Sequence, residues 1–416
     1  MGLGNKLKKD NNTEAATLAT AQQPVSVGGY NATNVPALAS QRPAPMNIQE
    51  IQRVQQLAHT ANTESYSRQS NSFGLVKPFA PNDGVNPEIS SLLVEKMWRM
   101  VCIRNLFGFY TQSSLQQLVD RACKHDWRLI QTRKGIPSID MTCDLAVLGL
   151  CDIILFIDDS GSMSTREVSE DNMTRWEVAK QVVQTISDIA TMMDADGIVT
   201  RFFNNSKEGN GLSSAQEVAN LFDGVSPSGG TPLGTKMRER IINGIVRPYL
   251  QNNELQRPVL VMTITDGEPT GSIDEKKEIE KVLIEAKNMF RSTKYGEFGI
   301  FFSFSQIGID ASATEFLGYL DTHPVVGNFV DCTSAYSIEK AECGPDFTES
   351  AYLIKLMIGA IDPAYDASDE QGVQPTVAQH VSSSIFSYPW SNSSAPQQQQ
   401  HIPVVQAQPY NPNQTY

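Results

Sequence analysis

The chain has 416 residues and a formal net charge of −13. It is therefore long enough to bury a large core, and it lacks the overall positive field that nucleic acid or an anionic membrane would attract. It contains no run of about 18 apolar residues, so we expect no transmembrane segment. Its six cysteines form no CxxC pair, which argues against a structural zinc site. With no recognisable signal peptide, free thiols indicate a cytoplasmic protein, without excluding the nucleus.

Both ends of the chain have the composition of segments that do not fold on their own. Residues 1–82 are rich in Ala, Gln, Asn, Thr, Ser and Pro and poor in aromatic side chains, and residues 364–416 are similar. Such segments bury too little apolar surface to offset the entropy lost on ordering. We therefore expect a disordered N-terminal arm over 1–82 and a disordered C-terminal tail over 364–416.

Residues 83–150 have the apolar spacing of helices. Ile89, Leu93 and Met97 recur at helical intervals, and Ser113 with Gln116 has the spacing of a capping box at the start of a second helix. A third helix is expected over 139–150. Because about 65 residues seldom form a stable core alone, we expect this helical segment to pack on the domain that follows.

Residues 151–363 alternate between apolar runs and amphipathic stretches. Strands are expected at 151–157, 197–203, 258–265, 298–308 and 325–331. Helices are expected after Thr174, at 215–222, at 232–250 with Thr231 as cap, at 273–292, after Ser312 with Glu315, and at 347–361. This alternation predicts an α/β fold, a doubly wound and mostly parallel sheet flanked by helices.

Polar residues follow two of the apolar strands directly. Asp158, Ser160 and Ser162 come after the strand 151–157, and Asp266 in "TITDGEPT" comes after the strand 258–265. Thr231 stands in "SGGTPLGT", at the start of a helix. In sheets of this class ligands bind at the carboxyl ends of the strands, near the topological switch point. An all-oxygen set of this kind suits Mg²⁺, Mn²⁺ or Ca²⁺ rather than zinc or copper.

These residues resemble the von Willebrand factor A-type (vWA) family, which includes integrin I domains and has a Rossmann-like fold. The pattern DxSxS, a Thr after Gly-Gly and an Asp in "TDG" resembles the family's metal-ion-dependent adhesion site. The resemblance implies direct metal coordination by Ser160 and Ser162, by Thr231 directly or through water, and a largely water-mediated or hydrogen-bonding role for Asp158 and Asp266. It also implies an open metal position for the Asp or Glu of a protein partner, and a last helix that moves when that partner binds.

Other interpretations of the same residues are weaker. Asp159-Ser160-Gly161 fits the aspartate motif of subtilisin-like proteases, but no histidine is followed by glycine as that triad requires. Residues 229–236 look like a P-loop, but Thr precedes Lys where the motif needs Lys first. The same oxygen cluster could also exist without metal, as a hydrogen-bonded network.

We therefore expect a non-enzymatic, divalent-cation-dependent protein-binding module of the adhesion or scaffold type. A metal-dependent hydrolase is the first alternative, although it would need a general base near the site. A regulatory subunit of a larger intracellular assembly is the second, with 83–150 as its docking surface. Asp159 and Glu268 are expected to be solvated acids at the rim. The sequence does not indicate an oligomeric state.

Overall fold

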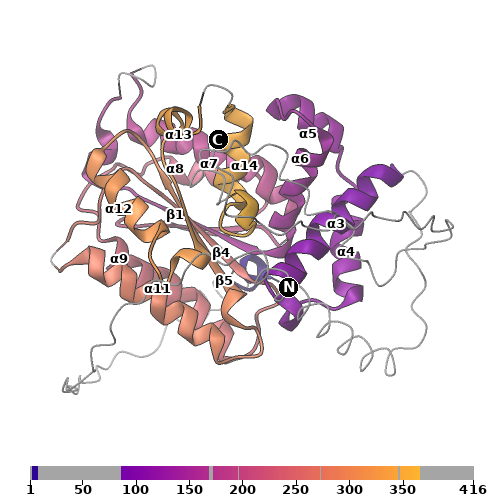
Figure 1. Cartoon of the computed structure of the whole chain (residues 1–416). Helices are drawn as coiled ribbons and strands as arrows, with labels where there is room; N and C mark the ends of the chain where they lie inside the picture. Colours follow the sequence, from indigo (N-terminus) through magenta and orange to yellow (C-terminus); the bar gives the residue numbers. More distant parts are fainter. Residues whose placement is uncertain are drawn as a thin grey trace, which may run out of the picture.

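A computed structural model of the chain describes residues 2–7, 86–167, 172–194, 196–271, 273–344 and 347–365 (Figure 1). The disordered arm and tail expected from the sequence lie outside these residues, except for 2–7 and the first two residues of the tail. Residues 3–7 form a short helix that lies against the domain.

One sheet of six strands, in the order β3-β2-β1-β4-β5-β6, organises the domain. The strands are β1 (Asp152–Ile157), β2 (Ile198–Phe202), β3 (Glu208–Leu212), β4 (Val259–Thr265), β5 (Ile300–Gln306) and β6 (Val330–Thr333). Neighbours are parallel except for β3, which is antiparallel to β2. The expected doubly wound, mostly parallel sheet is confirmed. From β1 the sheet extends to one side through β2 and β3, and to the other side through β4, β5 and β6. The topological switch point therefore lies between β1 and β4.

The central strand β1 is buried on both of its faces. Ile153, Leu155 and Ile157 belong to one apolar core, and Ile154 and Phe156 belong to the other. This double burial explains why the strand reads as a continuous apolar run rather than as an alternating pattern. It also fixes the register that brings the polar residues after β1 to the edge of the sheet.

The helices form two layers, one on each side of the sheet (Figure 1). The first core includes residues of α3 (Pro87–Ile103), α4 (Gln112–Ala122), α5 (Trp127–Lys134), α6 (Ile139–Asp144), α7 (Arg175–Met193), α8 (Ala215–Phe222) and α14 (Glu349–Ile358). The second includes residues of α9 (Leu233–Lys236), a π-helical stretch (Met237–Val246), α10 (Arg247–Gln251), α11 (Glu275–Arg291) and α12 (Ala311–Asp321). Figure 1 shows α3, α4, α5 and α6 gathered at one side of the domain.

The helical segment before the sheet is bonded to the end of the domain. Arg104, on the first turn after α3, donates from Nε to the carbonyl oxygen of Ile361 at 2.7 Å and from Nη2 to that of Ala360 at 3.2 Å. The hydroxyl of Tyr365 donates to Asp144 Oδ2 at 2.6 Å. Residues of α3 to α6 also share one continuous apolar core with α7 and α14.

Several helix starts differ from the sequence expectation. The second helix is capped by Thr111, whose Oγ1 accepts from the amide of Ser114 at 3.2 Å, and not by Ser113. The helix after β5 is capped by Asp310 and not by Ser312. In both cases the capping residue stands two residues before the expected one, and spacing alone does not distinguish them. The capping box of Thr174 with Glu177 is confirmed.

Other differences concern short or irregular elements. The expected edge strand over 325–331 is a 3₁₀ turn (Gly327–Phe329) followed by β6, and the third helix ends in 3₁₀ geometry over Leu145–Leu150. The patterns in the sequence did not predict β3, α5 and α13 (Tyr336–Cys343). The strand β3 contains two glycines in the stretch Glu208–Leu212, so it lacks the β-branched and aromatic residues that identify a strand.

Residues 2–7 are bonded to the end of the sheet at which the parallel strands begin, which we call the amino edge; the end at which they finish is the carboxyl edge. The amide of Gly2 donates to Asp196 Oδ2 at 2.9 Å, and the amide of Leu3 donates to Asp152 Oδ2 at 3.2 Å. Asn5 adds a bond from Nδ2 to Asp196 Oδ1 at 2.9 Å, and the Leu3 side chain is buried in the second core. This short helix therefore covers the edge of the sheet opposite to the one at which β1 and β4 end.

The close approach of residues 2–7 requires glycine. A Cβ on Gly4 would lie 2.3 Å from the carbonyl oxygen of Gly197 and 2.6 Å from that of Asp196, both of them backbone atoms that cannot move alone. We predict that Gly4→Ala releases the segment, so that the Leu3 amide loses its protection from hydrogen exchange and the melting temperature falls. Gly318→Ala is the matched control, because nothing lies within 4 Å of its added Cβ. Retained protection of Leu3 in Gly4→Ala would contradict the prediction.

The shared core generates a second prediction. A chain that begins at residue 151 loses the apolar surface of α3 to α6 that covers α7 and α14. We expect the 151–365 chain to melt at a lower temperature than the 86–365 chain, or to be insoluble, because buried apolar surface becomes exposed. Thermal unfolding of both chains, followed by circular dichroism, gives the comparison. Equal melting temperatures would show that residues 86–150 are an independent module.

Candidate cation site

Two carboxylates lie side by side where β1 and β4 end. Asp158 and Asp266 directly follow these strands, and both are fully buried. Ile157 pairs with Ile264 in the parallel ladder, and the amide of Asp158 donates to the carbonyl oxygen of Ile264 at 2.9 Å. The sheet register therefore brings the two acids to the switch point, where sheets of this class bind ligands.

Asp158 organises the loop that follows it. Its Oδ1 accepts from the amide of Ser160 at 2.8 Å, and its Oδ2 accepts from Thr265 Oγ1 at 2.6 Å. Burial and, after it, the neighbouring charge of Asp266 raise the pKa of Asp158 to about 7. Because protein donors occupy both oxygens, this residue fixes the geometry of the site rather than presenting a free ligand atom.

Three oxygens form a chain of hydrogen bonds beside these acids. Ser160 Oγ lies 2.9 Å from Ser162 Oγ, which donates to Asp266 Oδ1 at 2.9 Å. The 3₁₀ turn Gly161–Ser164 brings Ser162 back over the strand end. Ser160 is buried while Ser162 is exposed, so the oxygen chain runs from the interior to solvent. Hydroxyl and carboxylate oxygens in this arrangement are hard ligands of the kind that Mg²⁺, Mn²⁺ and Ca²⁺ take.

Thr231 lies in a loop that is bonded to the same turn. The amide of Gly161 donates to the carbonyl oxygen of Gly229 at 3.0 Å, which joins the two loops. The carbonyl oxygen of Thr231 accepts from the amide of Thr270 at 2.9 Å, and its amide donates to Thr270 Oγ1 at 3.2 Å. Its hydroxyl takes part in none of these bonds. Thr231 does not cap the helix as expected, because α9 begins at Leu233 and has no side-chain cap.

Arg175 belongs to this site but was not predicted from the sequence, and the same holds for Thr265 and Glu167. Arg175 Nη1 donates to Asp266 Oδ2 at 3.0 Å, and its Nε donates to Glu167 Oε1 at 2.5 Å. Burial lowers the pKa of Arg175, but the bonds to Asp266 and Glu167 outweigh burial and raise it overall. The available signal was a basic residue in the first turn of α7, where the helix dipole disfavours a cation unless a carboxylate compensates it.

Asp159 is not the solvated rim acid expected from the sequence. It is 2% exposed, and its two oxygens accept from the backbone amides of Asn204 and Asn205, each at 2.7 Å. Burial raises its pKa, and these two amides oppose the rise. Asp159 thus joins the end of β1 to the loop after β2. Glu268 is the rim residue of the two, half-exposed and paired with Lys276 at 2.6 Å.

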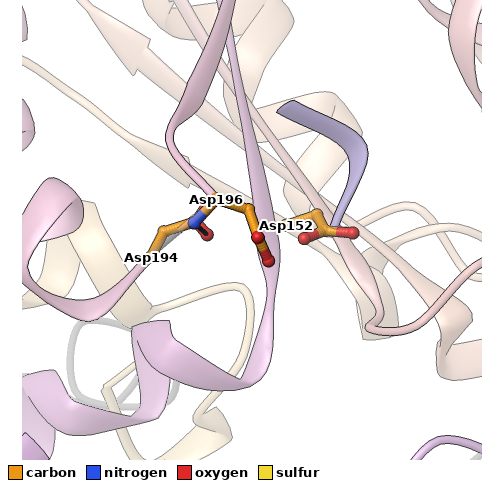
Figure 2. A group of neighbouring side chains, drawn as sticks. All are labelled: Asp152, Asp194 and Asp196. Atoms are coloured by element: carbon orange, nitrogen blue, oxygen red, sulfur yellow. Dashed lines mark hydrogen bonds between the residues drawn. The ribbon is translucent and has the colours of Figure 1, made fainter. Parts of the chain in front are cut away.

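A second group of carboxylates lies at the opposite edge of the sheet. Oxygens of Asp152, Asp194 and Asp196 lie within 4.8 Å of one another (Figure 2). Arg257 pairs with all three, from Nε to Asp152 at 3.1 Å and from Nη2 to Asp194 at 3.0 Å and to Asp196. Residues 2–7 donate amides to Asp152 and Asp196, so the cluster has bonding partners from within the chain. We assign it a structural role.

The sequence of the domain matches a known family. Residues 150–353 match the family model of the vWA domain found in the C terminus of TerF. The match makes this segment similar to vWA domains, and we refer to it below as the vWA-type domain. No curated protein matches the chain. No helix within the described residues is long and apolar enough to cross a membrane.

Solved structures resemble the vWA-type domain only distantly. Proximal thread matrix protein 1 from the mussel byssus has 19% identity and a TM-score of 0.32 over 50% of this chain and 47% of that protein, so the chain spans about half of its length. The same protein with a zinc-occupied MIDAS motif has 17% identity and a TM-score of 0.32 over 52% and 48% of the two chains. Manganese-loaded TRAP of Plasmodium vivax has 15% identity and a TM-score of 0.28 over 45% and 69%. Likeness at this level carries no argument about function.

The two acids expected at the rim generate a matched prediction. Asp159→Ala should lower the free energy of unfolding by about 2–4 kcal/mol, because two buried amide donors lose a charged acceptor. Glu268→Ala should change it by less than about 1 kcal/mol, since it removes only an exposed ion pair. Urea unfolding of both variants gives the two values. Similar values for both variants would contradict the assignment of Asp159 to the interior.

Proposed function

We propose that the chain is a non-enzymatic protein-binding module whose vWA-type domain holds a divalent cation, Mg²⁺ or alternatively Mn²⁺ or Ca²⁺, for an acidic residue of a partner protein. The hydrogen-bonded series of Ser160, Ser162 and Asp266 oxygens supports the proposal most directly. It offers two neutral hydroxyls and one carboxylate oxygen, which is a suitable donor set for a hard cation, and its Ser162 end is exposed to solvent.

Each residue of the site has a definite task in this proposal. Ser160 and Ser162 would hold the ion directly, and Thr231 would hold it directly or through water. Asp266 and Asp158 would act through water or hydrogen bonds, Asp158 by fixing the Ser160 loop. When bound, the ion would supply an uncompensated positive charge, because hydroxyl ligands neutralise little of it. That charge would favour a carboxylate from another protein in the open position.

A metal-dependent hydrolase has less support from the same structure. Hydrolysis at a bound ion generally needs a base to accept a proton from water. The described histidines do not supply one at this edge. His323 follows α12, which leads the chain back from the carboxyl edge to the amino edge before β6, and it lies beside Glu280 at 3.4 Å. His125 stands in the turn between α4 and α5, outside the sheet.

Paired serine substitutions test the proposal. Ser162 and Ser164 are both exposed residues of the same 3₁₀ turn, but only Ser162 bonds to Ser160 and Asp266. We predict that Ser162→Ala weakens Mn²⁺ binding by at least about tenfold, because even outer-shell partners of metal ligands are worth about 10–100-fold. Ser164→Ala should bind as the unmodified chain does. Isothermal titration with Mn²⁺ measures both.

The partner is tested under the same conditions. Proteins retained by the immobilised chain in Mg²⁺ should be lost with a chelator and with Ser162→Ala, and retained with Ser164→Ala. A partner that binds equally well in Mg²⁺ and in chelator would overturn the cation-dependent function. Equal Mn²⁺ affinity of the two alanine variants would overturn the site itself.

A further inference from the structure

Arg175 lies between two carboxylates at the cation site. The buried Asp266 has one oxygen bonded to Ser162 and the other to Arg175. Glu167 holds the guanidinium from its other side through Nε. The side chains of Arg175 and Glu167 are 13% and 12% exposed, so this row of charges is largely shielded from water. Charge interactions are stronger in such a place than on an open surface.

The backbone is shaped to keep this row together. The amide of Arg175 donates to the carbonyl oxygen of Thr165 at 2.9 Å, and the amide of Glu167 donates to that of Met173 at 3.0 Å. These bonds pair the two segments on either side of residues 168–171 and keep Glu167 opposite Arg175. Gly308, at φ +78°, leaves room for the pair, since a Cβ there would lie 2.8 Å from Glu167 Oε1 and 2.9 Å from Arg175 Nε.

We propose that Arg175 is an internal counter-ion of Asp266 that competes with the divalent cation, and that Glu167 retains Arg175 when the cation binds. The inference rests on the proposed function in taking Asp266 as part of the cation site. A guanidinium suits this role because it is permanently charged and can bond to two carboxylates at once through its planar fork. Arg175 is a positioning residue here, acting on the ion through Asp266.

Two physical consequences follow. Without a divalent ion, Asp266 is not left as an unpaired buried charge, so the domain does not need the ion in order to fold. With the ion present, the positive charge of Arg175 repels it and lowers the affinity of the site for the ion. Glu167, which lies on the far side of Arg175 from Asp266, partly offsets this repulsion. The Arg175–Glu167 pair is therefore a fixed dipole with its positive end toward the site. Each member should affect cation affinity with the opposite sign.

Four proteins test this inference with Mn²⁺ alone as the probe: the unmodified chain and three variants of it. Arg175→Gln removes the positive charge and should tighten Mn²⁺ binding roughly tenfold, the effect of one unit charge at short range in a partly buried site. Glu167→Gln should weaken it severalfold, because the arginine is no longer balanced. The double variant Arg175→Gln with Glu167→Gln should bind within about threefold of the unmodified chain. Isothermal titration measures affinity, and circular dichroism shows that each variant is folded.

A second readout uses stability without any cation. In chelator, Arg175→Gln should melt at a lower temperature than the unmodified chain, because Asp266 loses its counter-ion, and Mn²⁺ should raise its melting temperature by more. If Arg175 only stabilised the fold, Arg175→Gln would instead weaken Mn²⁺ binding, because Asp266 would be displaced from the site.

The outcomes separate the inference from the proposed function. If the unmodified chain binds Mn²⁺ and Arg175→Gln binds it equally or more weakly, the inference alone is overturned. If only Arg175→Gln binds Mn²⁺, the counter-ion role is supported and the cation-dependent function of the unmodified chain is not. If neither protein binds Mn²⁺, both proposals are overturned.

Discussion

The structure depends on the burial of two adjacent carboxylates where β1 and β4 end. Asp158 and Asp266 have no access to solvent, and a buried charge persists only where donors or an opposite charge compensate it. The surrounding loops supply that compensation. The amide of Ser160 and the hydroxyl of Thr265 bond to Asp158, while Ser162 and Arg175 bond to Asp266. The conformation of the loops at this edge thus follows from the need to give each of the four carboxylate oxygens a hydrogen-bond donor.

Buried carboxylates are compensated differently at the two edges of the sheet. At the amino edge, Arg257 pairs with three aspartates, and the amides of Gly2 and Leu3 donate to two of them. At the carboxyl edge, Arg175 pairs with Asp266, but an exposed hydroxyl, that of Ser162, stands next to it. A closed cluster of charges stabilises a fold, whereas a cluster that ends in exposed neutral oxygens can also accept an external ion. Among the residues that the structure describes, this difference favours the carboxyl edge as the candidate site.

The sequence was most informative where a residue's role is set by a strand. A continuous apolar run of strand length is typical of a strand buried on both faces, and the residue after it then lies where that strand ends. Asp158 and Asp266 could therefore be predicted to lie close together without a structure. Arg175 and Glu167 could not. They meet because two segments on either side of residues 168–171 pair with each other and because Gly308 leaves space beside them. No periodicity in the sequence encodes these contacts.

The burial of Asp159 is a second feature that could not be predicted from the sequence. In sequence it is one of two adjacent aspartates at a strand end, and an acid in such a loop is usually solvated. Its burial follows from the position of the loop after β2, whose amides of Asn204 and Asn205 point at it. Whether an acid after a strand faces solvent or a neighbouring loop depends on strand order in space, which adjacency in the chain does not give.

The helical segment before the domain bears on whether the last helix can move. In the resembled family that helix shifts when a partner's acid reaches the metal. Here the residues just after α14 are bonded by Arg104 to the end of α3, and Tyr365 is bonded to Asp144. A displacement of α14 would have to break these buried bonds and separate a shared apolar core. A partner could cause it only by binding the displaced state more tightly, by at least the free energy lost in breaking these contacts. The segment of residues 86–150 therefore favours one position of α14. Under the proposed function, partner binding at the carboxyl edge would then depend on the local geometry of the Ser160 loop rather than on a large helix movement.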